Sequence, residues 1–146
     1  MKEKCQTPLA PSGNLRPLRT LIVDDSTLLL SCCRRLLDAQ ALVQVVGTAA
    51  NGSEALHKAD MLTPDLVLMD LRMPCMDGLQ ATALLRRRLP NTRIIIMTLD
   101  DTVEAKAAAR ANGAHGFVGK TRILDDLMTE IRRVFRLKHA NDERSL

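Results

Sequence analysis

The chain has 146 residues, of which 46% are hydrophobic and 26% charged, and its formal net charge is +4. This length and composition are typical of one globular domain that buries its own apolar core. With no Trp or Tyr and only two Phe residues, that core must be aliphatic. The positive charge is too small to require a nucleic-acid partner.

Residues 1–17 contain three prolines and show no apolar periodicity, so we predict a flexible leader. From Leu18 onward, short aliphatic runs alternate with longer amphipathic stretches, as in repeated βα units around a parallel sheet. The expected strands are Arg19–Val23, Val43–Thr48, Leu66–Asp70, Arg93–Thr98 and Gly116–Val118. The expected helices lie near Ser26–Ala39, Gly52–Met61, Leu79–Leu89, Asp101–Asn112 and Arg122–Lys138. This pattern predicts one α/β domain over residues 18–138 and a polar tail over residues 139–146.

The last two expected helices differ in what they can bury. The helix near 122–138 carries an apolar stripe at helical spacing, which predicts contact with the core. The stripe consists of Leu124, Leu127, Met128, Ile131, Val134 and Phe135. The helix near 101–112 is rich in alanine, so it has strong helix propensity but little apolar bulk. We expect it to be loosely anchored and able to shift at low packing cost.

The cysteines indicate a reducing compartment. The four residues, Cys5, Cys32, Cys33 and Cys75, lack both C-x-x-C spacing and a paired histidine pattern, which argues against zinc. The start of the chain has no apolar stretch typical of a secretory signal, and no run approaches a membrane span. We therefore expect a cytoplasmic protein without membrane contact.

Carboxylates end two of the expected strands. Asp24 and Asp25 follow the run Leu21-Ile22-Val23, and Asp70 closes Leu66–Asp70. Ligands of an open parallel sheet bind outside the carboxyl ends of the strands, so these side chains should converge. Three adjacent carboxylates repel one another unless protons or a cation neutralise them, and Mg²⁺ prefers oxygen ligands. The sequence therefore predicts a magnesium site.

Two further strand ends add groups that suit phosphoryl oxygens. Thr98 ends the fourth strand and Lys120 follows the fifth, so a hydroxyl and an ammonium would face the same pocket. Each residue alone is more often a turn residue, a helix cap or a solvated charge. Together, a carboxylate nucleophile, a metal, a cation and a hydroxyl describe aspartyl-phosphate formation.

Four motifs resemble those of the receiver domains of two-component response regulators. They are Ile22–Asp25, Met69–Pro74 followed by Asp77-Gly78, Ile96–Thr98 and Gly113–Lys120. The resemblance covers about residues 18–138, and within the family this sequence is most similar to the receivers of nitrate-response regulators. The resemblance implies a five-stranded doubly wound parallel sheet with five helices, in the flavodoxin-like order 2-1-3-4-5.

The resemblance also implies a role for each residue of the site. Asp70 would accept a phosphoryl group from a histidine kinase or phosphotransfer protein. Asp25, Asp70 and the backbone carbonyl of Arg72 would bind Mg²⁺, while Asp24 would act mainly through metal-bound water. Lys120 would pair with the phosphoryl group.

Thr98 and Phe117 are implied to form a switch. Thr98 would hydrogen-bond the phosphoryl group, and Phe117 would turn inward as Thr98 moves. The output surface would be the fourth helix, fifth strand and fifth helix, meeting a downstream protein target or a second copy of the chain. Its basic residues, which suit an acidic partner, are Lys106, Arg110, Arg122 and Arg133.

Several residues near the site depart from the family pattern or carry extra charge. Leu99 stands where a small residue is usual, beside the path to the phosphoryl group, and Cys75 stands where Gly is common. Arg72 and Asp100 each lie two positions beyond a site residue, and their opposite charges predict a pair across the pocket mouth. Such a pair would impede attacking water and lengthen the phosphorylated lifetime, whereas two independent solvated side chains are the alternative.

Other functions are weighed against this one. An aspartyl phosphohydrolase commonly needs a second carboxylate two residues after the nucleophile, but Arg72 stands there, so we expect no enzyme. Only eight residues, most of them polar, follow Lys138, too few for a DNA-reading head, so we expect no direct binding of nucleic acid. The chain is then a stand-alone receiver or the N-terminal receiver fragment of a DNA-binding transcriptional regulator. A phosphorylation-independent interaction module is the third reading.

The remaining cysteines and histidines of the domain receive no catalytic role. We expect Cys32 and Cys33 to pack as small apolar residues. His57 and His115 are expected on the surface.

Overall fold

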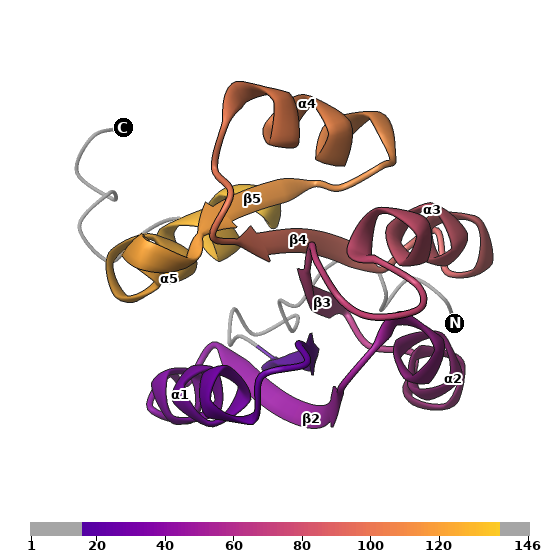
Figure 1. The fold of residues 1–146 in the computed structure, drawn as a ribbon. Coiled ribbons are helices and arrows are strands. Elements are labelled where there is room, and N and C mark those ends of the chain that lie inside the picture. The colour runs from indigo at the N-terminus through magenta and orange to yellow at the C-terminus, as the bar shows by residue number, and fades with distance from the viewer. Residues whose placement is uncertain (1–15, 138–146) are drawn as a thin grey trace.

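The computed structural model describes residues 16–137 of the chain. Five parallel strands form one sheet in the order β2-β1-β3-β4-β5 (Figure 1). The strands are β1 (Leu18–Val23), β2 (Val43–Ala49), β3 (Leu66–Asp70), β4 (Arg93–Thr98) and β5 (Gly116–Gly119). The helices are α1 (Thr27–Asp38), α2 (Gly52–Leu62), α3 (Gly78–Arg88), α4 (Val103–Ala111) and α5 (Ile123–Val134), with a 3₁₀ turn, η2 (Lys120–Arg122), before α5. The predicted doubly wound α/β fold and its strand order are confirmed.

The core lies in two layers, one on each face of the sheet. Successive strand residues point to opposite faces, and β3 shows this clearly. Its Val67 and Met69 pack with α2, α3 and α4, whereas Leu66 and Leu68 pack with α1 and α5. In the part of the chain that the structure describes, the fully buried residues of both layers include no aromatic side chain. The aliphatic core expected from composition is therefore observed.

Polar side chains begin four of the helices that follow strands. The side-chain oxygens of Ser26, Asn51, Asp77 and Thr102 each accept a hydrogen bond from a backbone N–H in the first turn of the next helix. Such caps satisfy N–H groups that have no partner within the helix. They fix the point at which each connection at the carboxyl edge of the sheet joins its helix, and the polar site lies at this edge.

The last helix is shorter than predicted. It was expected to continue to Lys138, but α5 ends at Val134, and Arg136 has a φ of 58°. A residue in this left-handed conformation ends a helix, and a helical sequence pattern does not reveal it. The predicted apolar stripe is also narrower, because Leu127 is fully buried whereas Leu124 is 75% exposed.

The alanine-rich helix α4 is lightly anchored. Ala105 and Ala109 are its buried residues, and Val103 is 79% exposed. The helix lies along the edge of the sheet beside β5 (Figure 1). Methyl groups bury little apolar area, so a displacement of α4 costs less than that of a helix anchored by leucines.

The predicted segment boundaries lie mostly beyond the structure. The leader over residues 1–17 lies outside the described residues apart from Arg16 and Pro17, and the tail over residues 139–146 lies wholly outside them. Within residues 16–137, none of the helices has the length and apolar character needed to span a bilayer.

Candidate functional site

Three carboxylates meet at the carboxyl edge of the sheet. Asp24 follows β1 and is fully buried, Asp70 ends β3 and is 4% exposed, and Asp25 lies beside them in an exposed position. The register pairs Val23 with Met69 on adjacent parallel strands, which brings the next residues, Asp24 and Asp70, side by side. One oxygen from each carboxylate lies within 4.8 Å of the others. The convergence predicted from the strand ends is therefore present.

Lys120 brings an ammonium group into this cluster. Its Nζ lies 2.7 Å from Asp24 Oδ2 and 2.8 Å from Asp70 Oδ1. Burial alone would lower the pKa of Lys120, but the hydrogen bonds to both carboxylates hold that pKa above its usual value. Burial raises the pKa of Asp70, and the charges of Asp24 and Asp25 add to this, although Lys120 opposes them.

The donor set fits a divalent cation. Three carboxylates against one ammonium leave two negative charges uncompensated when all four groups are ionised. Asp24 Oδ1 accepts a hydrogen bond from the Ser26 N–H at 2.8 Å, which fixes the orientation of this carboxylate. Oxygen ligands and an excess of negative charge suit Mg²⁺, and the buried carboxylates are costly without neutralisation.

A cavity of about 420 Å³ opens beside these groups. Thr98, at the end of β4, is buried in its wall, and its Oγ1 accepts a hydrogen bond from the Asp100 N–H at 3.0 Å. The hydroxyl keeps its own proton to donate. Leu99 also lines the cavity and is 75% exposed, so its apolar side chain stands at the mouth as expected.

The predicted pair across the mouth is formed. Arg72 Nη2 lies 3.1 Å from Asp100 Oδ2, joining the loop after β3 to the loop after β4. The Arg72 side chain is 77% exposed, so the pair adds little to stability. Hydrogen bonds from Thr102 and Arg72 hold the pKa of Asp100 below its usual value.

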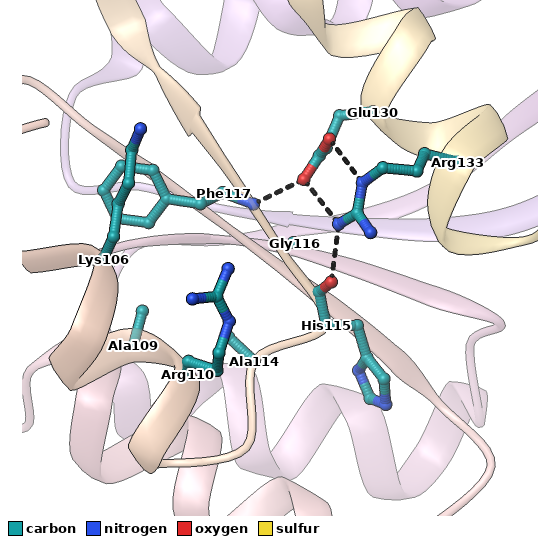
Figure 2. Close-up of a pocket in the computed structure, with 9 residues that line it drawn as sticks. All are labelled: Lys106, Ala109, Arg110, Ala114, His115, Gly116, Phe117, Glu130 and Arg133. Carbon is teal, nitrogen blue, oxygen red and sulfur yellow. Dashed lines mark hydrogen bonds and ion pairs between the residues drawn. The ribbon is translucent and has the colours of Figure 1, made fainter. Parts of the chain in front are cut away.

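Phe117 lies on β5, beside the strand that ends at Thr98. The register pairs Phe117 with Ile96 and Gly119 with Thr98. The Phe117 ring is half-buried, with Lys106 Nζ 5.8 Å from the ring centroid (Figure 2). The two residues of the predicted switch therefore lie on adjacent strands.

Glu130 contacts the switch region, although its place in the sequence does not predict this contact. Glu130 Oε2 accepts a hydrogen bond from the Phe117 N–H at 3.0 Å, and the Glu130 carboxylate is paired with Arg133 (Figure 2). The spacing of Glu130 and Arg133 indicates a pair on one helix, but nothing in the sequence shows that it reaches β5. Arg122, also assigned to the basic output surface, is paired with Asp126.

Two expectations about His and Cys residues are wrong. His115 is half-buried rather than on the surface, and its Nδ1 accepts a hydrogen bond from the Ile94 N–H at 3.0 Å. Burial, together with the charges of Arg86 and Arg93, lowers the pKa of His115 to about 4. Cys33 is buried as expected, but Cys32 is exposed because it faces away from the sheet on α1.

A sheet of this order with three carboxylates, a lysine and a hydroxyl at its carboxyl edge is the arrangement implied by the receiver resemblance. The model of the response regulator receiver domain family matches residues 20–132. The chain therefore belongs to the response regulator receiver domain family.

Curated relatives agree with this assignment. The chain is 34% identical over 121 residues to response regulator protein VraR of Staphylococcus saprophyticus, covering 82% of this chain and 57% of the relative. It is 32% identical over 121 residues to the nitrate/nitrite response regulator protein NarL of Escherichia coli, covering 83% and 56%. It is 34% identical over 127 residues to a protein-glutamate methylesterase/protein-glutamine glutaminase of Methanococcoides burtonii, covering 81% and 36%. The chain thus spans between about a third and three fifths of these relatives.

Solved structures show the same fold. The response regulator domain of Thermotoga maritima CheB superimposes with a TM-score of 0.76 at 30% identity, covering 85% of this chain and all of that one. The receiver domain of a putative NarL from Mycobacterium tuberculosis gives a TM-score of 0.70 at 34% identity, covering 77% and 94%. The recognition of a receiver from its motifs is confirmed.

Proposed function

We propose that this chain is a phosphorylation-controlled receiver in which Asp70 accepts a phosphoryl group from a histidine kinase or phosphotransfer protein. The observation that carries the proposal is the placement of Asp70, which is 4% exposed, in the cavity wall with Lys120 Nζ 2.8 Å from its Oδ1. A buried carboxylate held beside a cation and two further carboxylates is suited to nucleophilic attack on phosphorus.

The transfer is a displacement at phosphorus. An Asp70 carboxylate oxygen forms the new bond to phosphorus, and the phosphorus–nitrogen bond of the donor phosphohistidine breaks, with its electron pair passing to the imidazole nitrogen. Lys120 pairs with the phosphoryl oxygens, and the Thr98 hydroxyl donates a hydrogen bond to them. Thr98 and Phe117 then switch the surface of α4, β5 and α5 that meets a protein partner or a second copy of the chain.

Asp24, Asp25 and Asp70 would hold Mg²⁺, with the backbone carbonyl of Arg72 as a further oxygen ligand. When bound, the ion neutralises negative charge on the transferring phosphoryl group. Asp24 would act mainly through water bound to the ion. These ligand roles carry over from the family pattern, and the uncompensated charge of the cluster supports them.

We also propose the extent of the receiver, its location in the cell and its lack of enzymatic activity. We assign the receiver to residues 18–138 and the cytoplasm as its location, in keeping with the free thiols of Cys32, Cys33 and Cys75. We infer no enzymatic turnover on small substrates, because Arg72 occupies the position where phosphohydrolases carry a second carboxylate.

A second candidate keeps this chemistry but changes the output. A DNA-binding response regulator of the LuxR family from Staphylococcus aureus has a similar structure, with a TM-score of 0.74 at 26% identity. The chain also spans only 56% of NarL and 57% of VraR. The receiver would then control a DNA-binding segment joined to it, and the length of the complete coding sequence distinguishes the two candidates.

Intact-mass spectrometry tests the proposal. The chain is incubated with Mg²⁺ and acetyl phosphate, and wild type is compared with Asp70→Asn. We expect one phosphoryl-sized mass gain that disappears in the variant. Asp125→Asn, at an exposed carboxylate in the first turn of α5, is the matched control and should label like wild type. No gain in wild type, or a gain that persists in Asp70→Asn, would overturn the assignment of Asp70 and favour a phosphorylation-independent module.

A further inference from the structure

The outer edge of β5 is covered by two side chains of α5 (Figure 2). Glu130 Oε2 accepts a hydrogen bond from the Phe117 N–H at 3.0 Å, and Arg133 Nη2 donates one to the His115 carbonyl oxygen at 2.9 Å. These two backbone groups flank Gly116, and a neighbouring parallel strand would use the same pair. The two side chains therefore occupy the hydrogen-bonding positions that a sixth strand would use at this edge.

The carboxylate and the guanidinium hold each other in this position. Arg133 Nε donates to Glu130 Oε1 at 2.9 Å and Arg133 Nη2 donates to Oε2 at 2.8 Å, a bidentate pair. Burial alone would raise the pKa of Glu130, but the hydrogen bonds from Arg133 and from the Phe117 N–H keep it below its usual value. With its side chain 19% exposed, Glu130 is a fixed, charged acceptor for the β5 backbone.

Gly116 leaves the space that this contact needs. A Cβ at position 116 would lie 2.7 Å from Glu130 Oε2 and 2.9 Å from Val134 Cγ2. Any larger residue would therefore push the carboxylate of α5 away from the strand. The sequence of β5 and the side chain of α5 are matched at this one point.

Phe117 is thus held firmly on one side and loosely on the other. Its backbone N–H is bound to Glu130, whereas its ring lies against α4, where Lys106 Nζ is 5.8 Å from the ring centroid. The α4 residues buried nearby are alanines, which pack weakly.

We propose that Glu130 is the positioning residue of the switch. It holds the β5 backbone at Phe117 in register with β4, so that phosphorylation moves the ring and α4 rather than the strand. Without this bond, the unphosphorylated protein samples both ring positions and the response to phosphorylation shrinks. The inference rests on the proposed function, because the switch requires a phosphoryl group on Asp70.

The two Phe residues of the chain provide a direct probe. Labelling with fluorophenylalanine gives two ¹⁹F resonances, and Phe135→Leu identifies the one from Phe117. The Phe117 resonance is recorded with Mg²⁺, before and after addition of acetyl phosphate. Intact mass gives the phosphorylated fraction of the same sample, and circular dichroism reports folding. The variants are Glu130→Ala, Glu130→Gln and Gly116→Ala, with Asp126→Asn as the control that breaks an exposed ion pair on the same helix.

In wild type, we expect the Phe117 resonance to move on phosphorylation. In Glu130→Ala it should start part of the way towards the phosphorylated position, so that the displacement falls by about half or more at a similar phosphorylated fraction. Glu130→Gln should restore most of the displacement, since its amide oxygen still accepts from the Phe117 N–H, and Asp126→Asn should match wild type. Gly116→Ala should reduce the displacement of the Phe117 resonance in the same way while leaving Glu130 in the chain. If Glu130→Ala does not fold, Gly116→Ala tests the inference in its place.

The outcomes distinguish a failure of the inference about Glu130 from a failure of the proposed function. A full wild-type displacement in folded, phosphorylated Glu130→Ala or Gly116→Ala overturns the inference, as does an equal loss in Glu130→Gln and Asp126→Asn. A wild-type chain that gains no phosphoryl mass overturns the proposed function, and the inference with it.

Discussion

His115 is expected to make the fold less stable as the pH falls below neutral. Its Nδ1 accepts a hydrogen bond from the Ile94 N–H at 3.0 Å, which requires the neutral ring. Burial, with the nearby charges of Arg86 and Arg93, lowers the pKa of His115 from 6.5 to about 4. The folded protein therefore binds this proton at lower pH than the unfolded chain does.

The sign and size of the effect follow from linkage. Well above the unfolded-state pKa of 6.5 the ring is neutral in both states and adds no pH dependence. As the pH falls from 6.5 towards 4, the unfolded chain binds the proton first, so the free energy of unfolding decreases. For a fully shielded ring the free energy of unfolding would fall by about 2 kcal/mol at about pH 5. Because His115 is only half-buried, we expect a fall of about 1 kcal/mol.

The assay is urea unfolding of wild type and His115→Asn at neutral pH and at about pH 5, followed by far-ultraviolet circular dichroism because the chain has no Trp or Tyr. The Asn amide oxygen can replace Nδ1 as the acceptor without titrating. Between the two pH values, the free energy of unfolding should fall by about 1 kcal/mol more in wild type than in the variant. His57→Asn, at an exposed position of α2, controls for removal of a solvated imidazole. Equal losses in wild type and His115→Asn would refute the reasoning.

Three further substitutions test the site. A Cβ on Gly78 would overlap the Asp70 carbonyl oxygen. Gly78→Ala should therefore lower the free energy of unfolding in urea by about 2–4 kcal/mol and reduce labelling by acetyl phosphate. Values near those of wild type would contradict this close packing. Lys120→Met leaves Asp24 and Asp70 without a counter-charge and should lower the free energy of unfolding by about 3 kcal/mol. Added Mg²⁺ should restore part of this stability. A loss of stability that Mg²⁺ does not change argues against a metal site at these carboxylates. Arg72→Ala should change the free energy of unfolding by less than about 0.5 kcal/mol, because its pair with Asp100 is exposed. It should shorten the lifetime of the phosphorylated protein, followed over time by mass spectrometry. An unchanged lifetime would show that this pair does not impede attacking water.

The sheet and the centre of the site follow from local patterns in the sequence. Three buried strands carry aliphatic runs, and a residue of the site ends each strand or directly follows it. The register of these parallel strands therefore brings Asp24, Asp70 and Thr98 to one edge of the sheet. Lys120 could be placed with them because it follows the expected fifth strand, Gly116–Val118, after a single glycine. For these residues, position along the chain determines position in space.

The contacts that the sequence did not reveal join segments distant along the chain. His115 accepts a hydrogen bond from Ile94, and Glu130 reaches the N–H of Phe117, and neither bond has a periodic signature. The end of α5 depends on the backbone conformation of Arg136, which helical propensity does not determine. In each case tertiary packing decides the structure.

The light anchoring of α4 has a consequence for how this protein can evolve. Six of its nine residues are exposed, and the two buried ones are alanines. Substitutions at exposed helix positions usually change stability by less than about 0.5 kcal/mol. The outward face of α4 can therefore acquire new side chains by mutation while the sheet and its acidic cluster stay intact. Stability and surface identity are encoded in separate residues, which leaves this helix free to diverge between otherwise similar chains.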